Sequence, residues 1–219
     1  MNIILIGPPG SGKGTQAQKI LADFSLNYFS AGDILRGLAK EGSLLGREVA
    51  QVMAQGKLVS DDLMAQIIED FLAKNNGDII FDGYPRGLDQ AVFLEKALGD
   101  RGGISLIINL QVPEQVLIDR LSSRVICRDC GAVYNLITNP PKEKGACDDC
   151  GGPLYQRDDE TSEAVRKRLM VFDQQTKPVI EFFDRKGKLF NIDGNQSIEA
   201  IYQIIRKKLV DIGLKLTSA

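Results

Sequence analysis

The sequence predicts an α/β protein in which helices cover both faces of a parallel β-sheet. Short apolar runs alternate with segments of helical periodicity along most of the 219 residues, which is typical of a buried parallel sheet. A glycine-rich loop joins the first apolar run to the first helical segment. The segment 122–160 interrupts the alternation, because it is rich in Gly, Pro, Asp and Cys and too poor in apolar residues to form its own core. We therefore expect one core domain with an inserted segment.

The first part of the chain is mainly helical. Residues 2–6 are an apolar strand, and the apolar residues after the loop keep helical spacing. Ser30 and Asp33 are N-cap candidates for the next helix. Residues 33–75 have helical periodicity, with breaks near Gly42 and Gly56.

The second part alternates strands with helices. Proline is tolerated in the first turn of a helix, so Pro113 can open one. The expected strands are 79–82, 104–112 and 189–192, and the expected helices are 87–99, the segment from Pro113, 161–185 and 197–212.

Composition excludes several classes of function. The net charge is −2 and charges of both signs are mixed, which gives no reason to expect a nucleic-acid or membrane surface as partner. The apolar run 2–6 is too short for a signal peptide, and no stretch is long enough to span a membrane. We expect a cytoplasmic protein. The chain has no histidine, which excludes any mechanism that needs a histidine base or ligand.

Residues 7–13 match the phosphate-binding pattern G-x-x-x-x-G-K between a strand and a helix. Backbone N–H groups of such a loop can surround an anion, the helix N-terminus adds positive charge, and the lysine reaches the outer phosphates. A plain glycine-rich turn is the weaker alternative. The residues expected to bind nucleotide phosphates are Gly10, Ser11, Gly12, Lys13, Gly14 and Thr15.

The residue after Lys13 departs from the usual pattern, in which Ser or Thr follows the lysine and holds magnesium. Gly14 stands there and Thr15 follows. We expect Mg²⁺ to be held by Thr15 and by Asp82, the acid that ends the strand 79–82, in part through water. Asp82 could instead cap a helix.

The four cysteines form two C-x-x-C pairs, Cys127 with Cys130 and Cys147 with Cys150. Four thiolates match a closed tetrahedral zinc site, which is structural and not catalytic. Metal binding would supply the folding free energy that this segment lacks. Disulfides are the alternative, and a reducing cytosol disfavours them.

Several segments are similar to the signature motifs of the adenylate kinases, in the same order and spacing. They are GPPGSGKGTQ (7–16), SAGDILR (30–36), GKLV (56–59), FDGYPRGLDQ (81–90), DRLSSR (119–124) and the arginines of 157–168. The similarity covers about 1–212, and the cysteine-rich insertion resembles the zinc-type lid of bacterial members.

The resemblance implies a fold with three parts. The first is a P-loop NTPase-type core with a parallel five-stranded sheet flanked by helices. An NMP-binding helical segment and a zinc-binding lid are inserted into it. The implied bounds are 1–29, 60–121 and 161–219 for the core, 30–59 for the NMP-binding segment and 122–160 for the lid.

The resemblance also implies the reaction, the reversible Mg-dependent transfer ATP + AMP = 2 ADP of adenine nucleotide homeostasis. Arginines suit it because their planar forks bind phosphate oxygens. The implied catalytic residues are Lys13, Arg86, Arg124, Arg157 and Arg168. The implied AMP-binding residues are Ala31, Arg36, Lys57, Leu58, Val59, Gly83, Tyr84, Pro85, Arg86, Gln90, Arg157 and Arg168. For ATP, the resemblance adds Arg120, Arg124, Val133, Tyr134 and Gln196 to the phosphate loop.

Some of these assignments have alternatives. Any one arginine could instead form a surface ion pair, and Gln196 could lie in a plain strand-to-helix turn. Arg120 and Arg124 are spaced i, i+4, which predicts that they share one helical face.

Gln90 bears on the choice of nucleobase. It resembles the glutamine that hydrogen-bonds the adenine of AMP, and a side-chain amide can bond both edge groups of adenine. UMP/CMP-type kinases carry asparagine there. Ala31 points the other way, because many bacterial adenylate kinases have threonine at that position. Gln90, the GKLV segment and the long lid favour AMP.

Two alternatives to this function stay open. One is a UMP/CMP-type nucleoside monophosphate kinase, and a remote one is a nucleic-acid-binding zinc-ribbon NTPase. We expect a monomer whose partners are ATP, AMP and ADP, with neither nucleic acid nor a membrane among them.

Overall fold

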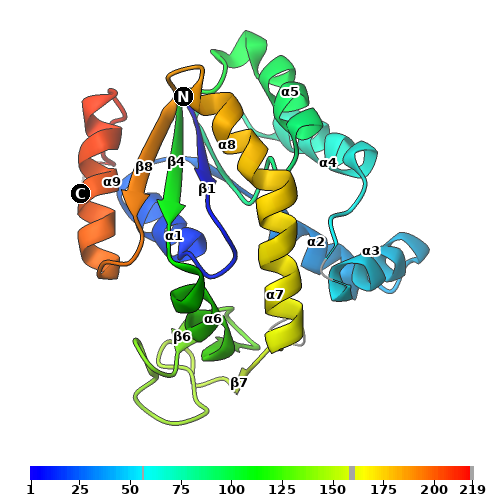
Figure 1. Ribbon diagram of the computed structural model, residues 1–219, viewed down its shortest axis with the longest axis vertical. Coiled ribbons are helices and arrows are strands. Elements are labelled where there is room, and N and C mark those ends of the chain that lie inside the picture. Colours follow the sequence, from blue (N-terminus) through cyan, green and yellow to red (C-terminus); the bar gives the residue numbers. More distant parts are fainter. Residues whose placement is uncertain (56, 158–160, 218–219) are drawn as a thin grey trace.

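The computed structural model describes residues 1–55, 57–157 and 161–217, and Figure 1 shows their arrangement. A five-stranded sheet in the order β2-β3-β1-β4-β8 forms the centre, and every neighbouring pair of its strands is parallel. The predicted sheet is thus confirmed. Its strands are β1 (Asn2–Ile6), β2 (Asn27–Ser30), β3 (Ile79–Asp82), β4 (Leu106–Gln111) and β8 (Leu189–Asp193).

The sheet is buried on both faces because its strands are apolar throughout. All five residues of β1 are buried. Ile3 and Leu5 pack into a core cluster on one face, and Ile4 and Ile6 pack into a second cluster on the other face. This accounts for continuous apolar runs in place of the apolar–polar alternation of a half-exposed sheet.

Helices from different parts of the chain cover the two faces. On one face, α1 (Lys13–Asp23) lies beside α9 (Ile198–Asp211). The other face is covered by α5 (Leu88–Ala97) and α8 (Lys177–Asp184), with α4 (Asp61–Lys74) packed on α5. Within the described ranges, no helix has both the length and the apolar character that crossing a membrane requires.

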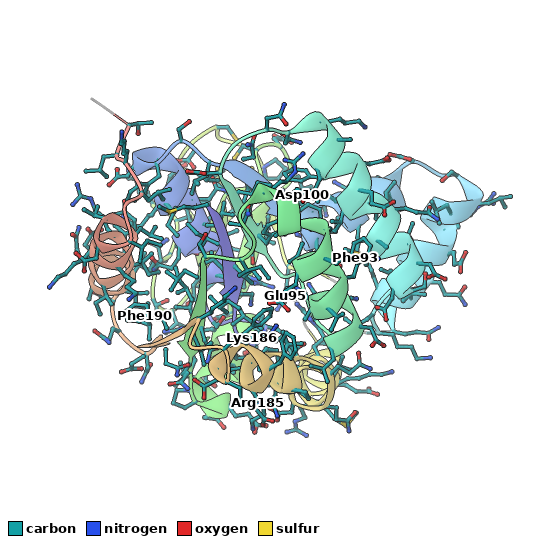
Figure 2. The ribbon with its side chains drawn as sticks, turned by 90° about the horizontal axis from the view of Figure 1, so that it is seen from above. Phe93, Glu95, Asp100, Arg185, Lys186 and Phe190 are labelled. Carbon is teal, nitrogen blue, oxygen red and sulfur yellow. The ribbon has the colours of Figure 1, made fainter. Side chains whose placement is uncertain are left out.

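An ion pair links α5 to the end of α8. Seen from above in Figure 2, Glu95 of α5 and Lys186 lie close together, and their side chains form a salt bridge. The Lys186 ammonium also lies 4.2 Å from the ring centroid of Phe182. The salt bridge joins α5 to the segment that follows α8.

Two short helices, α2 (Ala31–Lys40) and α3 (Leu44–Ala54), project to one side of the core (Figure 1). Of the two N-cap candidates, Ser30 caps α2 by accepting a hydrogen bond from the Asp33 backbone N–H at 3.3 Å, and Asp33 lies in the first turn of the helix. A Cβ at Gly46 would lie 2.4 Å from the Leu38 carbonyl oxygen, so only glycine allows the two helices to pack this closely. The predicted break near Gly56 falls on a residue outside the described ranges.

The cysteine-rich insertion forms a separate small sheet below the core (Figure 1). It follows η1 (Gly99–Arg101) and α6 (Glu114–Ser122) in the chain. Its antiparallel strands, in the order β6-β5-β7, are β5 (Arg124–Cys127), β6 (Val133–Asn135) and β7 (Leu154–Tyr155). Residues 158–160, which end the predicted lid, lie outside the described ranges.

The prediction that Arg120 and Arg124 share a helical face is wrong. Helix α6 ends at Ser122, and Arg124 is the first residue of β5. The hydroxyl of Ser122 donates to the Ile118 carbonyl oxygen at 2.7 Å, and the next serine donates to the carbonyl oxygen of Asp119 at 2.6 Å. Such bonds compete with continuation of the helix. Arg124 then pairs with Asn135 in the β5–β6 ladder, so its backbone is extended and not helical.

The predicted single helix 161–185 is interrupted. Helix α7 (Ser162–Val171) passes into a π-helical segment, Phe172–Thr176, before α8 begins. Pro178 stands in the first turn of α8. It has no N–H to donate in the α-helical pattern, and the preceding N–H, of Lys177, bonds instead to the Phe172 carbonyl oxygen. This bond spans five residues in place of four, so the turn contains one more residue than an α-helical turn.

Candidate functional site

The phosphate loop curls around the start of α1 at the carboxyl end of β1. Gly10 and Gly12 have φ angles of +83° and +94°, which favour glycine. A Cβ at Gly10 would also lie 2.9 Å from the Leu121 side chain. The Ser11 N–H donates to the Pro8 carbonyl oxygen at 3.1 Å and closes the turn.

The Lys13 side chain folds back over this loop. Its ammonium donates to the carbonyl oxygens of Gly7 at 2.7 Å and of Pro8 at 3.0 Å. The pKa of Lys13 is lowered to about 8, mainly by burial; Asp82 opposes this shift, and the cations Arg86, Arg168 and Arg124 add to it. The ammonium therefore lies in a concentration of positive charge, where an anion would be stabilised.

Asp82 ends β3 beside the loop, in register with Leu5 of β1 and Ser30 of β2. The Tyr28 hydroxyl lies 3.1 Å from Asp82 Oδ2 and donates to it. Burial raises the pKa of Asp82, and Lys13 opposes that rise. Asp82 and Thr15, the two expected magnesium ligands, both line the large cavity that the loop glycines also line.

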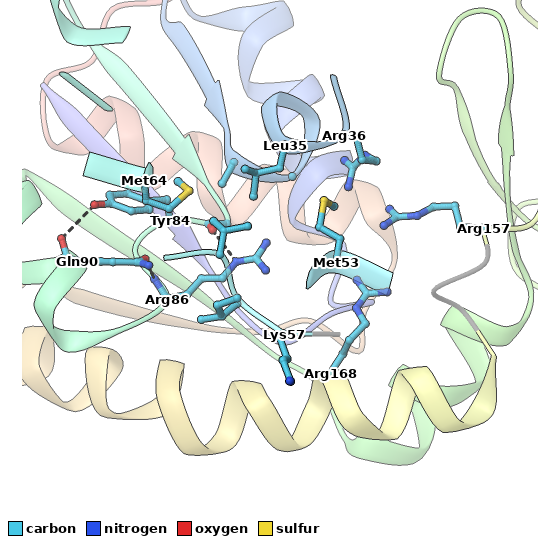
Figure 3. A pocket seen from close by; sticks show the side chains of 15 residues that line it. Leu35, Arg36, Met53, Lys57, Met64, Tyr84, Arg86, Gln90, Arg157 and Arg168 are labelled. Atoms are coloured by element: carbon cyan, nitrogen blue, oxygen red, sulfur yellow. Dashed lines mark hydrogen bonds between the residues drawn. The ribbon is translucent and has the colours of Figure 1, made fainter. Parts of the chain in front are cut away.

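A second, smaller cavity lies between α2, α4 and the loop after β3 (Figure 3). It has an apolar part formed by Leu35, Met53, Val59 and Met64 and a cationic end formed by arginines. Of the predicted AMP-binding residues, those that line it are Ala31, Arg36, Lys57, Leu58, Val59, Gly83, Tyr84, Arg86, Gln90, Arg157 and Arg168. Pro85 lines the large cavity instead.

Arg86 is held through both its side chain and its main chain. Its Nε donates to the Gly83 carbonyl oxygen at 2.8 Å. Its backbone N–H donates to Gln90 Oε1 at 2.8 Å, and its backbone carbonyl oxygen accepts from the Thr176 hydroxyl at 2.9 Å. Gln90 Nε2 in turn donates to Asp61 Oδ1 at 2.7 Å.

Four arginines line both cavities, and we call them the shared arginines: Arg36, Arg86, Arg157 and Arg168. They come from α2, the loop after β3, the end of the small sheet and α7, and Figure 3 shows their side chains directed toward a common space. Burial lowers the pKa of Arg86, and the cations Arg36 and Arg157 add to that effect against the opposing effect of Asp82. The junction between the two cavities is therefore suited to a polyanion.

Other predicted nucleotide contacts have different positions. Arg124, Val133 and Tyr134 line the large cavity. Arg120 is not among the residues that line either cavity; its Nη2 donates to the Gly194 carbonyl oxygen at 3.0 Å. Gln196 is also absent from both linings and is exposed in the turn after β8.

The four cysteine sulfurs form one cluster beside the small sheet. Their Sγ atoms all lie within 4.8 Å of one another. The separations from Cys127 to Cys150 and from Cys130 to Cys147 are both 3.5 Å, far longer than a disulfide bond of about 2.05 Å. The structure therefore favours the predicted metal cluster over disulfides.

Tyr134 supports this cluster from inside the small sheet. It is 7% exposed, and its hydroxyl lies 3.4 Å from Cys147 Sγ. The Asp148 N–H donates to the same hydroxyl at 2.8 Å, which leaves its hydrogen for the sulfur. This hydrogen bond is the largest of the causes that lower the pKa of the Cys147 thiol to about 6. The predicted stacking of Tyr134 on a nucleotide stays a prediction.

Three residues of this site were missed by the motifs: Tyr28, Asp61 and Thr176. Asp61 follows Ser60 at the start of α4, where an acid favours the helix N-terminus whatever else it contacts. Thr176 lies two residues before Pro178, and nothing else in the sequence marks it. Neither residue type identifies its partner, which is the Gln90 side chain for Asp61 and the Arg86 backbone carbonyl oxygen for Thr176.

Comparison with known proteins gives one family. A family model described as "Adenylate kinase" matches residues 5–188. The adenylate kinase of Syntrophomonas wolfei is 45% identical over 212 residues, which are 95% of this chain and 99% of the relative. That of Caldanaerobacter subterraneus is 44% identical, over 96% of each chain. The enzyme of the same name from Methanothrix thermoacetophila is 45% identical, over 95% of this chain and 98% of the relative.

Proposed function

The chain belongs to the adenylate kinase family, and from this we infer that it catalyses the reversible phosphoryl transfer ATP + AMP = 2 ADP. The observation that supports this most directly is the position of the shared arginines. Two cavities that meet at a cluster of guanidinium groups can hold two nucleotides with their phosphates facing each other. The glycine-rich loop opens into one of these cavities and Gln90 lines the other.

We assign the large cavity to ATP and the smaller one to AMP. N–H groups of the phosphate loop and Lys13 would hold the outer phosphates of ATP. Arg36 and Arg86 would hold the AMP phosphate, while Arg124, Arg157 and Arg168 would meet the transferring group. The apolar side chains around Met64 would contact the base of AMP.

Catalysis in this arrangement comes from position and charge. The sequence has no histidine, and phosphoryl transfer requires little more than alignment and charge stabilisation. The shared arginines would neutralise repulsion between the two nucleotides. Anion binding would also relieve the repulsion among the cations themselves, which already lowers the pKa of Arg86.

The residues near the loop fit a magnesium ion. Asp82 and Thr15 offer a carboxylate and a hydroxyl, the oxygen ligands that Mg²⁺ prefers, and both line the ATP cavity. Bound with the nucleotide, Mg²⁺ would neutralise charge on the phosphates. A cation beside Asp82 would also favour the ionised carboxylate that its burial disfavours.

The four cysteines fit a structural zinc ion. Tetrahedral Zn–S bonds of about 2.3 Å place sulfurs about 3.8 Å apart; here two pairs of sulfurs are 3.5 Å apart and all four lie within 4.8 Å of one another. Four thiolates leave no open position for a substrate. A chelator should lower the melting temperature of the purified enzyme and reduce the metal content from one zinc per chain. An unchanged melting curve after complete metal loss would contradict the structural role.

We further propose that 30–59 is an AMP-binding unit and 122–160 a lid over ATP, on a core of 1–29, 60–121 and 161–219. The enzyme acts as a monomer in the cytoplasm. The separate small sheet and the projecting helix pair support these two inserted units. Size-exclusion chromatography with light scattering tests the monomer, and a concentration-dependent dimer would contradict it.

A coupled assay of ADP production with ATP and a panel of monophosphates tests the function. AMP should be the preferred acceptor by a large margin over CMP and UMP. A preference for CMP or UMP would establish the pyrimidine alternative. Tight oligonucleotide binding with a steep salt dependence, together with no transfer to AMP, would establish a nucleic-acid-binding protein.

A further inference from the structure

The hydrogen bonds around Gln90 determine which end of its amide carries the oxygen. The Arg86 N–H donates to Oε1 at 2.8 Å, and Nε2 donates to Asp61 Oδ1 at 2.7 Å. A backbone N–H can bond only to the amide oxygen, and a carboxylate can bond only to the amide nitrogen. The reverse orientation would bring two donors together at one end and two acceptors together at the other.

Each end of this amide keeps the capacity for one further partner. Nε2 has a second N–H, and Oε1 has a second lone pair. Gln90 is 4% exposed and lines the AMP cavity. A base in that cavity is therefore the partner within reach, and it meets an acceptor and a donor in a fixed order.

Few other side chains of the cavity can distinguish bases by hydrogen bonding. Among the described residues that line it, the neutral polar side chains are Gln90 and Tyr84, and the remainder are apolar, cationic or glycine. The Tyr84 hydroxyl is directed to the Gln90 backbone carbonyl oxygen, at 3.4 Å. The distinction between an amino and a keto group on a purine thus depends mainly on Gln90.

We propose that Asp61 is a positioning residue that makes the enzyme select a 6-aminopurine over a 6-oxopurine monophosphate, by holding the Gln90 amide in one orientation. The proposal rests on the proposed function and adds to it the means of base selection. An exocyclic amino group donates to Oε1, whereas a keto oxygen in the same place would meet Oε1 as a second acceptor.

The amide could accommodate the keto group only by turning over. That rotation would break its bonds to both Arg86 and Asp61 and set like groups against each other. Hydrogen bonds to charged groups are among the stronger ones in proteins, so the carboxylate makes the larger contribution. The selection is therefore set by Asp61, which contacts Gln90 and need not contact the base.

The variant Asp61→Asn tests whether Asp61 fixes the orientation of the Gln90 amide, because it keeps a hydrogen-bonding partner for that amide in either orientation. Its amide can offer C=O to Gln90 in the present orientation and N–H to Gln90 in the reversed one. Asp62→Asn is the matched control, because Asp62 is the other acid in the first turn of α4 and is also exposed. Both variants remove one charge near the same helix N-terminus, but Asp61 is the acceptor of the Gln90 amide.

The measurement is kcat/KM for AMP and for IMP, the 6-oxo analogue, with ATP as donor. In Asp61→Asn the preference for AMP over IMP should fall by about tenfold or more, mainly through a lower KM for IMP, while kcat with AMP changes by less than about twofold. In Asp62→Asn both the preference and kcat should stay as in the wild type. A third variant, Asp61→Leu, removes the acceptor and should raise KM for AMP as well.

Equilibrium binding of AMP and of IMP in the absence of ATP measures the preference for AMP over IMP independently of turnover. An unchanged preference in Asp61→Asn, or an equal loss in both asparagine variants, would overturn the proposal. Those outcomes differ from failure of the proposed function, which would appear as a wild-type enzyme that transfers no phosphate to AMP.

Discussion

The Thr176 hydroxyl donates its hydrogen to the backbone carbonyl oxygen of Arg86 over 2.9 Å. Thr176 is the last residue of the π-helical segment and is 5% exposed. This bond connects the helix that carries Arg168 to the loop that carries Arg86. Two of the shared arginines are thereby held in a fixed relation.

We predict that Thr176→Val destabilises the fold and impairs transfer. Valine has nearly the same shape but leaves the Arg86 carbonyl oxygen without its donor, which costs about 1–3 kcal/mol of unfolding free energy. Because Arg86 also loses positional restraint, kcat/KM for AMP should fall by about tenfold. Urea denaturation and steady-state kinetics measure the two effects.

Thr176→Ser is the control, because it keeps the hydroxyl and loses only a methyl group. It should retain most of the activity of the wild type. Equal kcat/KM values for the serine and valine variants would show that the hydroxyl has no positioning role.

A second prediction concerns the charge of Lys13. Lys13→Met keeps the length of the side chain and removes the ammonium, and it should lower kcat by about 10³-fold, as expected for loss of a group that stabilises transition-state charge. Circular dichroism should show an intact fold. A variant with kcat within a few-fold of the wild type would exclude Lys13 from the catalytic set.

The same variant yields a pH dependence with a definite sign. Burial lowers the pKa of Lys13 from 10.5 to about 8 in the unliganded protein, so the unfolded chain binds this proton more tightly than the folded one. Below pH 8, the charged lysine therefore destabilises the fold relative to methionine. This cost declines as the pH rises from about 8 toward 10.5, the two pKa values of the group.

Lys13→Met should thus be more stable than the wild type at pH 7, and its advantage should shrink by about 1 kcal/mol at pH 9. Solvent access to the partly exposed side chain reduces the effect. Chemical denaturation of both proteins at the two pH values measures the difference. An advantage that stays constant or grows with pH would contradict the lowered pKa.

Motifs predicted the elements of this fold better than the contacts between them. The strand 79–82 is found with the same bounds, because an apolar run bounded by glycines has few alternatives. The strand β2 has only four residues, Asn27–Ser30, and two of them are polar, so its pattern was too weak to assign. The interruption at Phe172–Thr176 depends on one proline. The apolar periodicity of the segment does not show whether that proline interrupts the helix.

In the candidate site, too, residues that belong to motifs were easier to predict than the contacts between them. The motifs identified the shared arginines and Gln90, because these belong to recognisable segments. They could not identify Asp61, because the rest of α4 and all of β3 lie between it and Gln90 in the sequence. They also placed Arg120 with Arg124 on one helix, because spacing alone does not reveal that two serines end α6 before Arg124.

The last prediction concerns the hydroxyl of Tyr134 in the cysteine cluster. It lies 3.4 Å from Cys147 Sγ and accepts the Asp148 N–H at 2.8 Å. Groups that hydrogen-bond a metal ligand change metal affinity by about 10–100-fold when they are removed. Tyr134→Phe should therefore weaken zinc binding by about tenfold, as measured by competition with a chromophoric chelator.

Tyr155→Phe makes the same chemical change in the neighbouring strand pairing of the small sheet, where the ring packs under Arg128 at 4.4 Å. It should leave zinc affinity unchanged. Because Tyr134 also lines the ATP cavity, KM for ATP in both variants separates a role at the metal from a role at the nucleotide. A Tyr134→Phe enzyme with normal zinc affinity and a raised KM for ATP would assign the residue to nucleotide binding instead.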